Sequence, residues 1–134
     1  MKLLLDTHIW IWSKTAATKL PAKFRKVLSD PDNEFCLSPV SVWEFYTLLR
    51  KGRIDSPSIP APIWVEMATA NMTEAYLTHA IAQTSCQLKL PQSDPADRFI
   101  AATAAEHDLT LLTVDKELLA GAALNHQYKV MKPR

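Results

Sequence analysis

The chain has 134 residues, 48 % of them hydrophobic and 22 % charged, which is usual for a folded domain that can bury a core. No apolar run approaches the ~20 residues of a membrane span, and Asp6 interrupts the apolar N-terminus too early for a signal peptide. We therefore expect one domain over residues 1–134, in the cytoplasm and without membrane contact. The net charge of +1 names no partner. Cys36 and Cys86 each have apolar neighbours, which favours buried, reduced thiols over a disulfide or a metal pair.

Short apolar runs alternate with helical patterns along the chain. In chain order, the expected elements are a strand at 2–5, helices at 9–13 and 21–28, a strand at 34–37, helices at 39–51 and 63–72, a strand at 74–77, helices at 78–88 and 95–107, a strand at 109–113, a helix at 116–120 closed by Gly121, and a strand at 128–131. This alternation predicts the α/β class, with a central parallel sheet between two layers of helices. The carboxyl ends of all its strands then share one edge, where such sheets bind ligands.

Four acidic residues are expected at that edge. Asp6 and Asp115 directly follow predicted strands, and Glu44 and Asp97 fall in the first turns of helices entered from the same edge. Asp94 is best explained as the N-cap of the helix that contains Asp97.

Each of these acids also has a purely structural explanation. Asp6 can be a turn residue that caps the next helix, and Glu44 can complete a capping box with Ser41. His8 can face the same edge or be a locally bonded structural residue.

A cluster of carboxylates is unfavourable on its own, because like charges raise one another's pKa. A bound divalent cation removes this repulsion. Ligands that are all oxygen favour Mg²⁺ or Mn²⁺ over zinc, and no Cys/His spacing in the chain resembles a zinc site. Mg²⁺ held by few carboxylates commonly engages phosphate, which indicates hydrolysis of a phosphate ester.

The distribution of basic residues is typical of a protein that binds a nucleic-acid backbone. Without the four acids, the rest of the chain carries a net charge of +5. The basic residues form one group early in the chain and another after the Glu44 helix: Lys14, Lys19, Lys23, Arg25 and Lys26, then Arg50, Lys51 and Arg53. A solvated helix face is the simpler explanation for any single one of them, and Arg98 can meet phosphate or pair with an acid.

Four short motifs together resemble the PIN-domain family, and within it the VapC-type ribonuclease toxins of bacterial and archaeal toxin–antitoxin pairs. The motifs are Leu4-Leu5-Asp6-Thr7-His8 with Trp12 shortly after, Ser41-Val42-Trp43-Glu44, Asp94-Pro95-Ala96-Asp97-Arg98, and Leu112-Thr113-Val114-Asp115. The resemblance implies a three-layer α/β/α fold and RNA cleavage that depends on Mg²⁺ or Mn²⁺. It also implies a cognate antitoxin that blocks the site, and commonly a homodimer.

Carried over by position, the resemblance makes Asp6, Glu44, Asp97 and Asp115 the catalytic and metal-binding acids, with Asp6 and Asp97 as the preferred direct ligands. Residues adjacent to these acids in the same motifs are secondary candidates: Thr7, Asp94, Arg98 and Thr113. The chain departs from the pattern at three places that bear on substrate contacts: Gln92-Ser93 stands where His-Arg is common, Leu48 where Lys is common, and Ala96 where Phe is frequent.

Two other classes of protein share an acid at the end of the first strand. One is a phosphatase of the haloacid-dehalogenase kind with Asp6 as nucleophile, although His8 stands where a second Asp is usual. The other is a non-catalytic receiver-like module that accepts a phosphoryl group, although its late strand would be followed by Lys, where this chain has Asp115.

Overall fold

Five parallel strands form one sheet in the computed structural model, which describes residues 1–90 and 94–134. The departure at Gln92-Ser93 lies outside the described residues. The strands, in the spatial order β3-β2-β1-β4-β5, are β1 (Lys2–Leu5), β2 (Glu34–Leu37), β3 (Thr73–Glu74), β4 (Thr110–Leu112) and β5 (Lys129–Met131). The helices are α1 (Thr7–Thr15), α2 (Ala22–Leu28), α3 (Pro39–Arg50), α4 (Ala61–Ala68), α5 (His79–Gln87), α6 (Pro95–Glu106) and α7 (Lys116–Asn125), with a short 3₁₀ turn at Ala17–Lys19.

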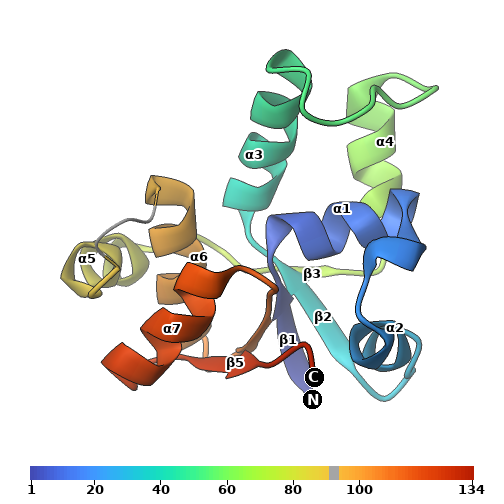
Figure 1. Cartoon of the computed structure of the whole chain (residues 1–134). Coiled ribbons are helices and arrows are strands. Elements are labelled where there is room, and N and C mark those ends of the chain that lie inside the picture. The colour runs from blue at the N-terminus through green and yellow to red at the C-terminus, as the bar shows by residue number, and fades with distance from the viewer. Residues whose placement is uncertain (91–93) are drawn as a thin grey trace.

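The helices cover both faces of the sheet, which confirms the predicted three-layer α/β/α architecture (Figure 1). Side chains alternate between the faces along each strand, so Leu3 and Leu5 join one core while Leu4 joins the other. The core around Leu4 is formed with α5, α6 and α7, where an alanine-rich α6 packs closely on the sheet. The core around Leu3 and Leu5 is formed with α1–α4 and is rich in aromatic side chains.

The register of the central strands places the ends of β1 and β4 side by side. Leu5 pairs with Leu112, and the backbone N–H of Asp6 donates to the Leu112 carbonyl at 3.0 Å. Asp6 and Thr113, which are 107 positions apart in sequence, therefore meet at the shared carboxyl edge of the sheet. Among the described residues, no helix is long and apolar enough to cross a membrane.

Helix α7 does not end at Gly121, as the sequence predicted, but continues to Asn125. A Cβ at Gly121 would overlap the Leu90 side chain and would lie 2.6 Å from the Tyr128 hydroxyl. The glycine therefore permits a close approach, and the helix ends instead at His126, whose φ of 55° is left-handed.

Several other boundaries shift. Helix α1 is longer than expected, because Asp6 caps it directly, and α4 begins two residues earlier, with Pro62 in its first turn. Strand β3 is shorter and earlier than the expected 74–77.

Both cysteines are free, as expected, but only Cys36 is buried. Cys86 is exposed, because α5 turns the preceding residue, Ser85, toward the core.

Candidate metal centre

Asp6 stands at the carboxyl end of β1, as the sequence predicted, and it also caps α1, as its structural explanation requires. Its Oδ1 accepts a hydrogen bond from the backbone N–H of Thr7 at 2.8 Å, and its Oδ2 accepts one from the Thr113 hydroxyl at 2.7 Å. The side chain is only 8 % exposed. Each oxygen keeps a second lone pair, so the carboxylate can still bind a cation.

Glu44 is not part of a capping box, because α3 begins at Pro39 and is capped by Ser38. It therefore lies in the second turn of the helix rather than the first. Glu44 Oε1 accepts a hydrogen bond from the Thr7 hydroxyl, and the Thr7 and Ser41 hydroxyls are 2.9 Å apart. Since Thr7 has one hydroxyl proton, the Ser41 hydroxyl donates to Thr7, and the chain Ser41–Thr7–Glu44 ties α3 to α1.

Asp97 lies in the first turn of α6, as the sequence predicted. Asp94 caps this helix, and its Oδ1 accepts from the Asp97 backbone N–H at 3.0 Å. This bond fixes the start of α6 beside the carboxyl edge of the sheet.

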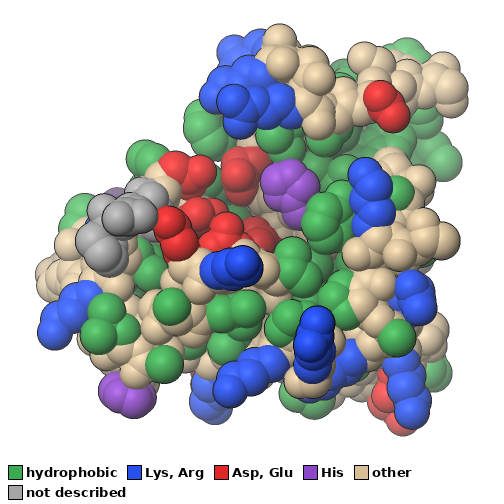
Figure 2. Space-filling model, in the orientation of Figure 1, with side chains coloured by type: hydrophobic (Ala, Val, Ile, Leu, Met, Phe, Trp, Pro, Cys, Tyr) green, Lys and Arg blue, Asp and Glu red, His purple; other side chains and the backbone are tan. Residues whose placement is uncertain are grey.

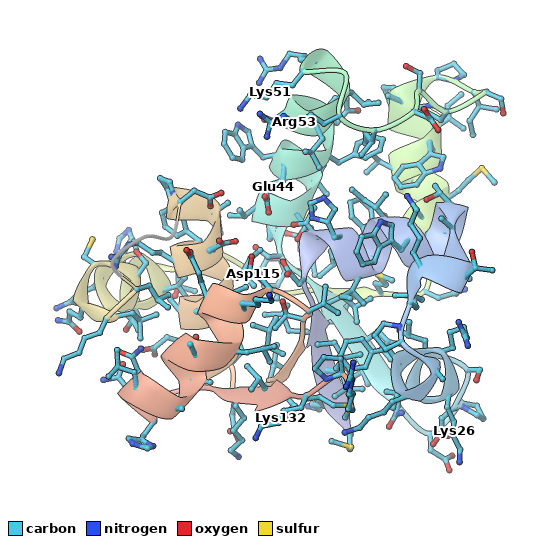
Figure 3. All side chains as sticks on the ribbon, viewed as in Figure 1. Lys26, Glu44, Lys51, Arg53, Asp115 and Lys132 are labelled. Atoms are coloured by element: carbon cyan, nitrogen blue, oxygen red, sulfur yellow. The ribbon has the colours of Figure 1, made fainter. Side chains whose placement is uncertain are left out.

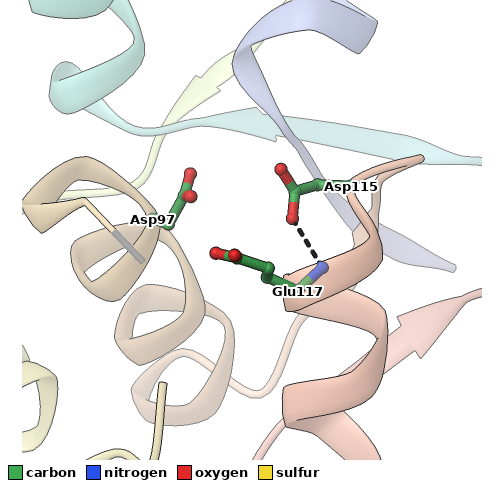
Figure 4. A group of neighbouring side chains, drawn as sticks. All are labelled: Asp97, Asp115 and Glu117. Carbon is green, nitrogen blue, oxygen red and sulfur yellow. Dashed lines mark hydrogen bonds between the residues drawn. The ribbon is translucent and has the colours of Figure 1, made fainter. Parts of the chain in front are cut away.

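Asp115 caps α7 and brings a further acid with it. Its Oδ1 accepts from the backbone N–H groups of Glu117, at 2.9 Å, and Leu118, at 3.1 Å. Carboxylate oxygens of Asp97, Asp115 and Glu117 all lie within 4.8 Å of one another (Figure 4). Among the described residues, this group of ligand-forming oxygens does not include Asp6 or Glu44.

The sequence analysis did not identify Glu117. The signal was present, because an acid in the first turn of a helix entered from the carboxyl edge of the sheet is the placement that singled out Asp97.

Thr113 joins Asp6 to Asp115. Its hydroxyl donates to Asp6 and accepts from the Asp115 backbone N–H at 3.0 Å. Thr113 is completely buried and Thr7 almost so, and both are secondary candidates that contact the acids directly.

The acids carry an electrostatic conflict in the absence of a cation. Burial raises the pKa of Asp97 to about 8, and the negative charges of Asp94, Asp6, Asp115 and Glu44 add to the effect. Burial also raises the pKa of Glu44 to about 7, against the stabilising hydrogen bond from Thr7. The pKa of Asp6 is raised by burial too, although the bonds from Thr113 and Thr7 oppose this.

These residues fit a hard divalent cation. The donor atoms are all carboxylate oxygens, and a 2+ charge among them would relieve both the desolvation and the repulsion that raise their pKa values. Asp97, Asp115 and Glu117 are close enough to share one ion.

Acidic side chains gather in one hollow of the molecular surface, and Lys and Arg side chains group beside it (Figure 2). Glu44 points from α3 toward the space above Asp115, and Lys51 and Arg53 lie at the far end of the same helix (Figure 3). Lys26 lies on α2, well away from both acids. The basic group after α3 is therefore placed to meet a ligand of the hollow, whereas Lys26, from the early group, is not.

The structure also places four other side chains that the sequence analysis named. Arg98 neither pairs with an acid nor faces the hollow, because its guanidinium donates to the carbonyls of Ser85, Leu88 and Leu90 at 2.8–3.1 Å. Leu48 packs on the aromatic core, and Ala96 is buried. His8 is exposed, and its ring centroid lies 5.6 Å from that of Trp12.

A family model described as the PIN domain matches residues 3–124, and the chain belongs to this family. It is 31 % identical to "Ribonuclease VapC22" of Mycobacterium tuberculosis over 119 residues, which covers 87 % of this chain and 88 % of that one.

Among solved structures, the fold is similar to VapBC2 from Rickettsia felis bound to a promoter DNA fragment, with a TM-score of 0.74, 16 % identity and 98 % of each chain covered. It is also similar to VapBC-1 from nontypeable Haemophilus influenzae, with a TM-score of 0.70, 18 % identity and 99 % and 98 % of the two chains covered. The family match favours neither the phosphatase nor the receiver interpretation.

Proposed function

We propose that the protein is an endoribonuclease of the VapC type, which hydrolyses RNA phosphodiester bonds with a bound Mg²⁺ or Mn²⁺. The observation that carries this proposal is the group of carboxylates of Asp97, Asp115 and Glu117 at the starts of α6 and α7. Oxygens of these three side chains lie within 4.8 Å of one another at the carboxyl edge of the sheet. Identity of 31 % to a protein named as a ribonuclease supports the choice of RNA.

We assign the binding of the cation to Asp97, Asp115 and Glu117, with Asp6 and Glu44 completing the acidic site. The bound cation would supply Lewis-acid stabilisation of the charge that develops on the phosphate. Thr113 holds the Asp6 carboxylate and the Asp115 backbone, and Thr7 holds Glu44, so the two threonines fix the positions of three acids.

The substrate backbone would meet the basic group that follows α3. Arg50, Lys51 and Arg53 are all exposed, and Figure 3 shows Lys51 and Arg53 where the Glu44 helix ends, beyond the acidic hollow. Positive charge in this position offsets the repulsion between the acidic site and RNA phosphates.

We propose a cognate antitoxin as the protein partner, as the toxin–antitoxin complexes with the same fold suggest. A homodimer is a separate proposal, supported by the exposed aromatic residues of α3: Trp43 is 58 % exposed and Tyr46 is 36 % exposed. A single nuclease domain acting in the cytoplasm is consistent with an intracellular RNA substrate.

Cleavage of RNA by matched Asp→Asn variants tests the proposal. Asp97→Asn removes a ligand charge from the cluster, while Asp108→Asn makes the same change at an exposed residue whose side chain pairs only with the exposed Lys129. Asp108 has a φ of 51°, a conformation that asparagine also adopts readily.

We expect Mg²⁺-dependent cleavage by the wild type and by Asp108→Asn, and its loss in Asp97→Asn, with a thermal unfolding midpoint in EDTA no lower than that of the wild type. Equal cleavage by all three proteins, or cleavage that persists in EDTA, would contradict the proposal.

A further inference from the structure

A second hollow lies next to the acidic site, between α1, α3, the segment that follows α3, and α4. Its volume is about 670 Å³, within the usual range for a small-molecule site. Its walls carry aromatic rings and its rim carries charge, and the residues that matter are His8, Trp12, Lys19, Phe45, Arg53 and Trp64. None of the residues assigned to the metal centre lines it.

The aromatic residues form a fixed floor and an accessible wall. Phe45 and Trp64 stack in parallel, with ring centroids 4.4 Å apart and an interplanar angle of 8°, and Phe45 is only 2 % exposed. Trp12 is partly exposed, and the exposed His8 ring lies tilted beside it, with the ring centroids 5.6 Å apart. A flat, uncharged ring can therefore lie against the Trp12 indole above a rigid apolar floor.

The hollow begins where the acidic site ends. Thr7 and Glu44 belong to the acidic site, and the next residue along each helix, His8 and Phe45, lines the hollow. Successive helical residues point about 100° apart, so α1 and α3 each present one face to either compartment.

The charges of the rim suit an anion. Lys19 and Arg53 are exposed, and neither side chain makes an ion pair within the described ranges 1–90 and 94–134. Asp55 is the acid among the lining residues, so cations outnumber anions there. Aromatic walls below a cationic rim match a nucleotide, whose base stacks and whose phosphate is negative.

We propose that this hollow binds an unpaired nucleobase of the RNA strand, next to the nucleotide held at the acidic site. The base stacks on Trp12 above the Phe45–Trp64 floor, and Arg53 and Lys19 hold the adjoining phosphate. The inference rests on the proposed ribonuclease function and adds to it a determinant of substrate choice, because a stacking pocket admits only single-stranded RNA at this position.

Binding of a fluorescein-labelled single-stranded hexaribonucleotide, measured by fluorescence anisotropy in EDTA, tests the pocket. Trp12→Leu keeps an apolar side chain but removes the flat face, and Trp12→Phe retains a stacking ring. Tyr76→Leu is the control, on an exposed aromatic residue outside the hollow. We expect about tenfold weaker binding for Trp12→Leu, in line with base stacking on aromatic residues. Trp12→Phe should recover most of this loss, and Tyr76→Leu should bind within about twofold of the wild type.

A scan with single abasic substitutions along the same oligonucleotide identifies the stacked base. An abasic substitution at one position should weaken binding to the wild type by about as much as Trp12→Leu does. The same abasic substitution should not weaken binding to the Trp12→Leu variant any further, because both changes remove the same contact. The proposal is overturned if Trp12→Leu binds the oligonucleotide with wild-type affinity. It is also overturned if an abasic substitution weakens binding to the wild type equally at every position.

Three further outcomes distinguish a failure of the pocket proposal from a failure of the ribonuclease proposal. Metal-dependent cleavage with an unchanged KM in Trp12→Leu overturns the pocket while leaving the ribonuclease proposal intact. Loss of antitoxin binding by Trp12→Leu, with RNA affinity unchanged, identifies the hollow as a protein-docking surface and also overturns the nucleobase assignment. An Asp97→Asn variant that still cleaves RNA contradicts the function itself.

Discussion

The acidic site and the aromatic hollow lie side by side but are built in different ways. The acidic site is made from the ends of secondary structure: Asp6, Asp94 and Asp115 are helix caps, and Asp97 and Glu117 lie in first turns. The hollow is made from the sides of two helices and an irregular segment after α3. Helix-cap hydrogen bonds and the two threonine hydroxyls thus position the acids, whereas packed aromatic rings form the floor of the hollow. We therefore expect substitutions in the acidic site to cause large losses of metal binding, and substitutions in the hollow to cause smaller losses of RNA affinity.

The largest expected effect is that of Glu117→Gln, which removes the third carboxylate of the close group. We expect the cleavage rate at low Mg²⁺ to fall about 100-fold, with partial recovery at high Mg²⁺, because the remaining ligands still bind the ion weakly. Rate measurements over a Mg²⁺ titration test this. A wild-type rate at every Mg²⁺ concentration would show that Glu117 takes no part.

Thr113→Val should lower cleavage about tenfold, because it removes the hydroxyl that positions Asp6 and accepts from the Asp115 backbone. Thr103→Val is the matched control: Thr103 is equally buried, but its hydroxyl donates only to the Phe99 carbonyl in its own helix. Comparison of kcat and of unfolding midpoints distinguishes the two positions. The positioning role of Thr113 is excluded if both variants lose the same activity.

Lys51→Gln should weaken RNA binding about threefold and reduce its dependence on salt, as the loss of one phosphate contact would. Lys26→Gln makes the same change on α2, remote from the acids, and should leave both quantities unchanged (Figure 3). Anisotropy titrations at several KCl concentrations provide the test. An equal effect at both positions would indicate non-specific attraction over the whole surface.

The metal-free protein should become less stable as pH rises. The pKa of Glu44 is raised to about 7 and that of Asp97 to about 8, whereas unfolded carboxyls titrate near 4. Between these values the folded state binds more protons than the unfolded state, so the stability present below pH 4 is lost as pH passes 7 and 8.

Unfolding midpoints in EDTA from pH 5 to 8.5 should therefore fall by a few degrees. Saturating Mg²⁺ should reduce this fall of the midpoint, because the bound cation then neutralises the carboxylates that protons neutralise at lower pH. Asp97→Asn should also flatten the profile, and a midpoint that rises with pH would contradict the electrostatic account.

The sequence predicted the sheet and the acids because both depend on local rules. Strands 2–5 and 34–37 have the predicted bounds, and the cap at Asp94 with Pro95 behind it places Asp97 without any tertiary information. The convergence of β1 and β4 then follows from the parallel sheet.

The errors arise where distant residues decide the outcome. Gly121 has the pattern of a helix stop, but the Leu90 side chain and the Tyr128 hydroxyl require a small residue there. Arg98 follows the candidate site acid Asp97 in sequence, yet its guanidinium donates to the carbonyls of Ser85 and Leu88 at the end of α5. The hollow beside Trp12 was not predictable, because its shape depends on how the segment after α3 folds back over α1.

A crystal structure of the wild type grown with Mn²⁺, with the ion located by its anomalous scattering, tests the central claim most directly. We expect an Mn²⁺ ion bound directly by carboxylate oxygens of Asp97, Asp115 and Glu117. An ion bound elsewhere, or a protein that cleaves RNA while this cluster holds none at saturating Mn²⁺, would contradict the account.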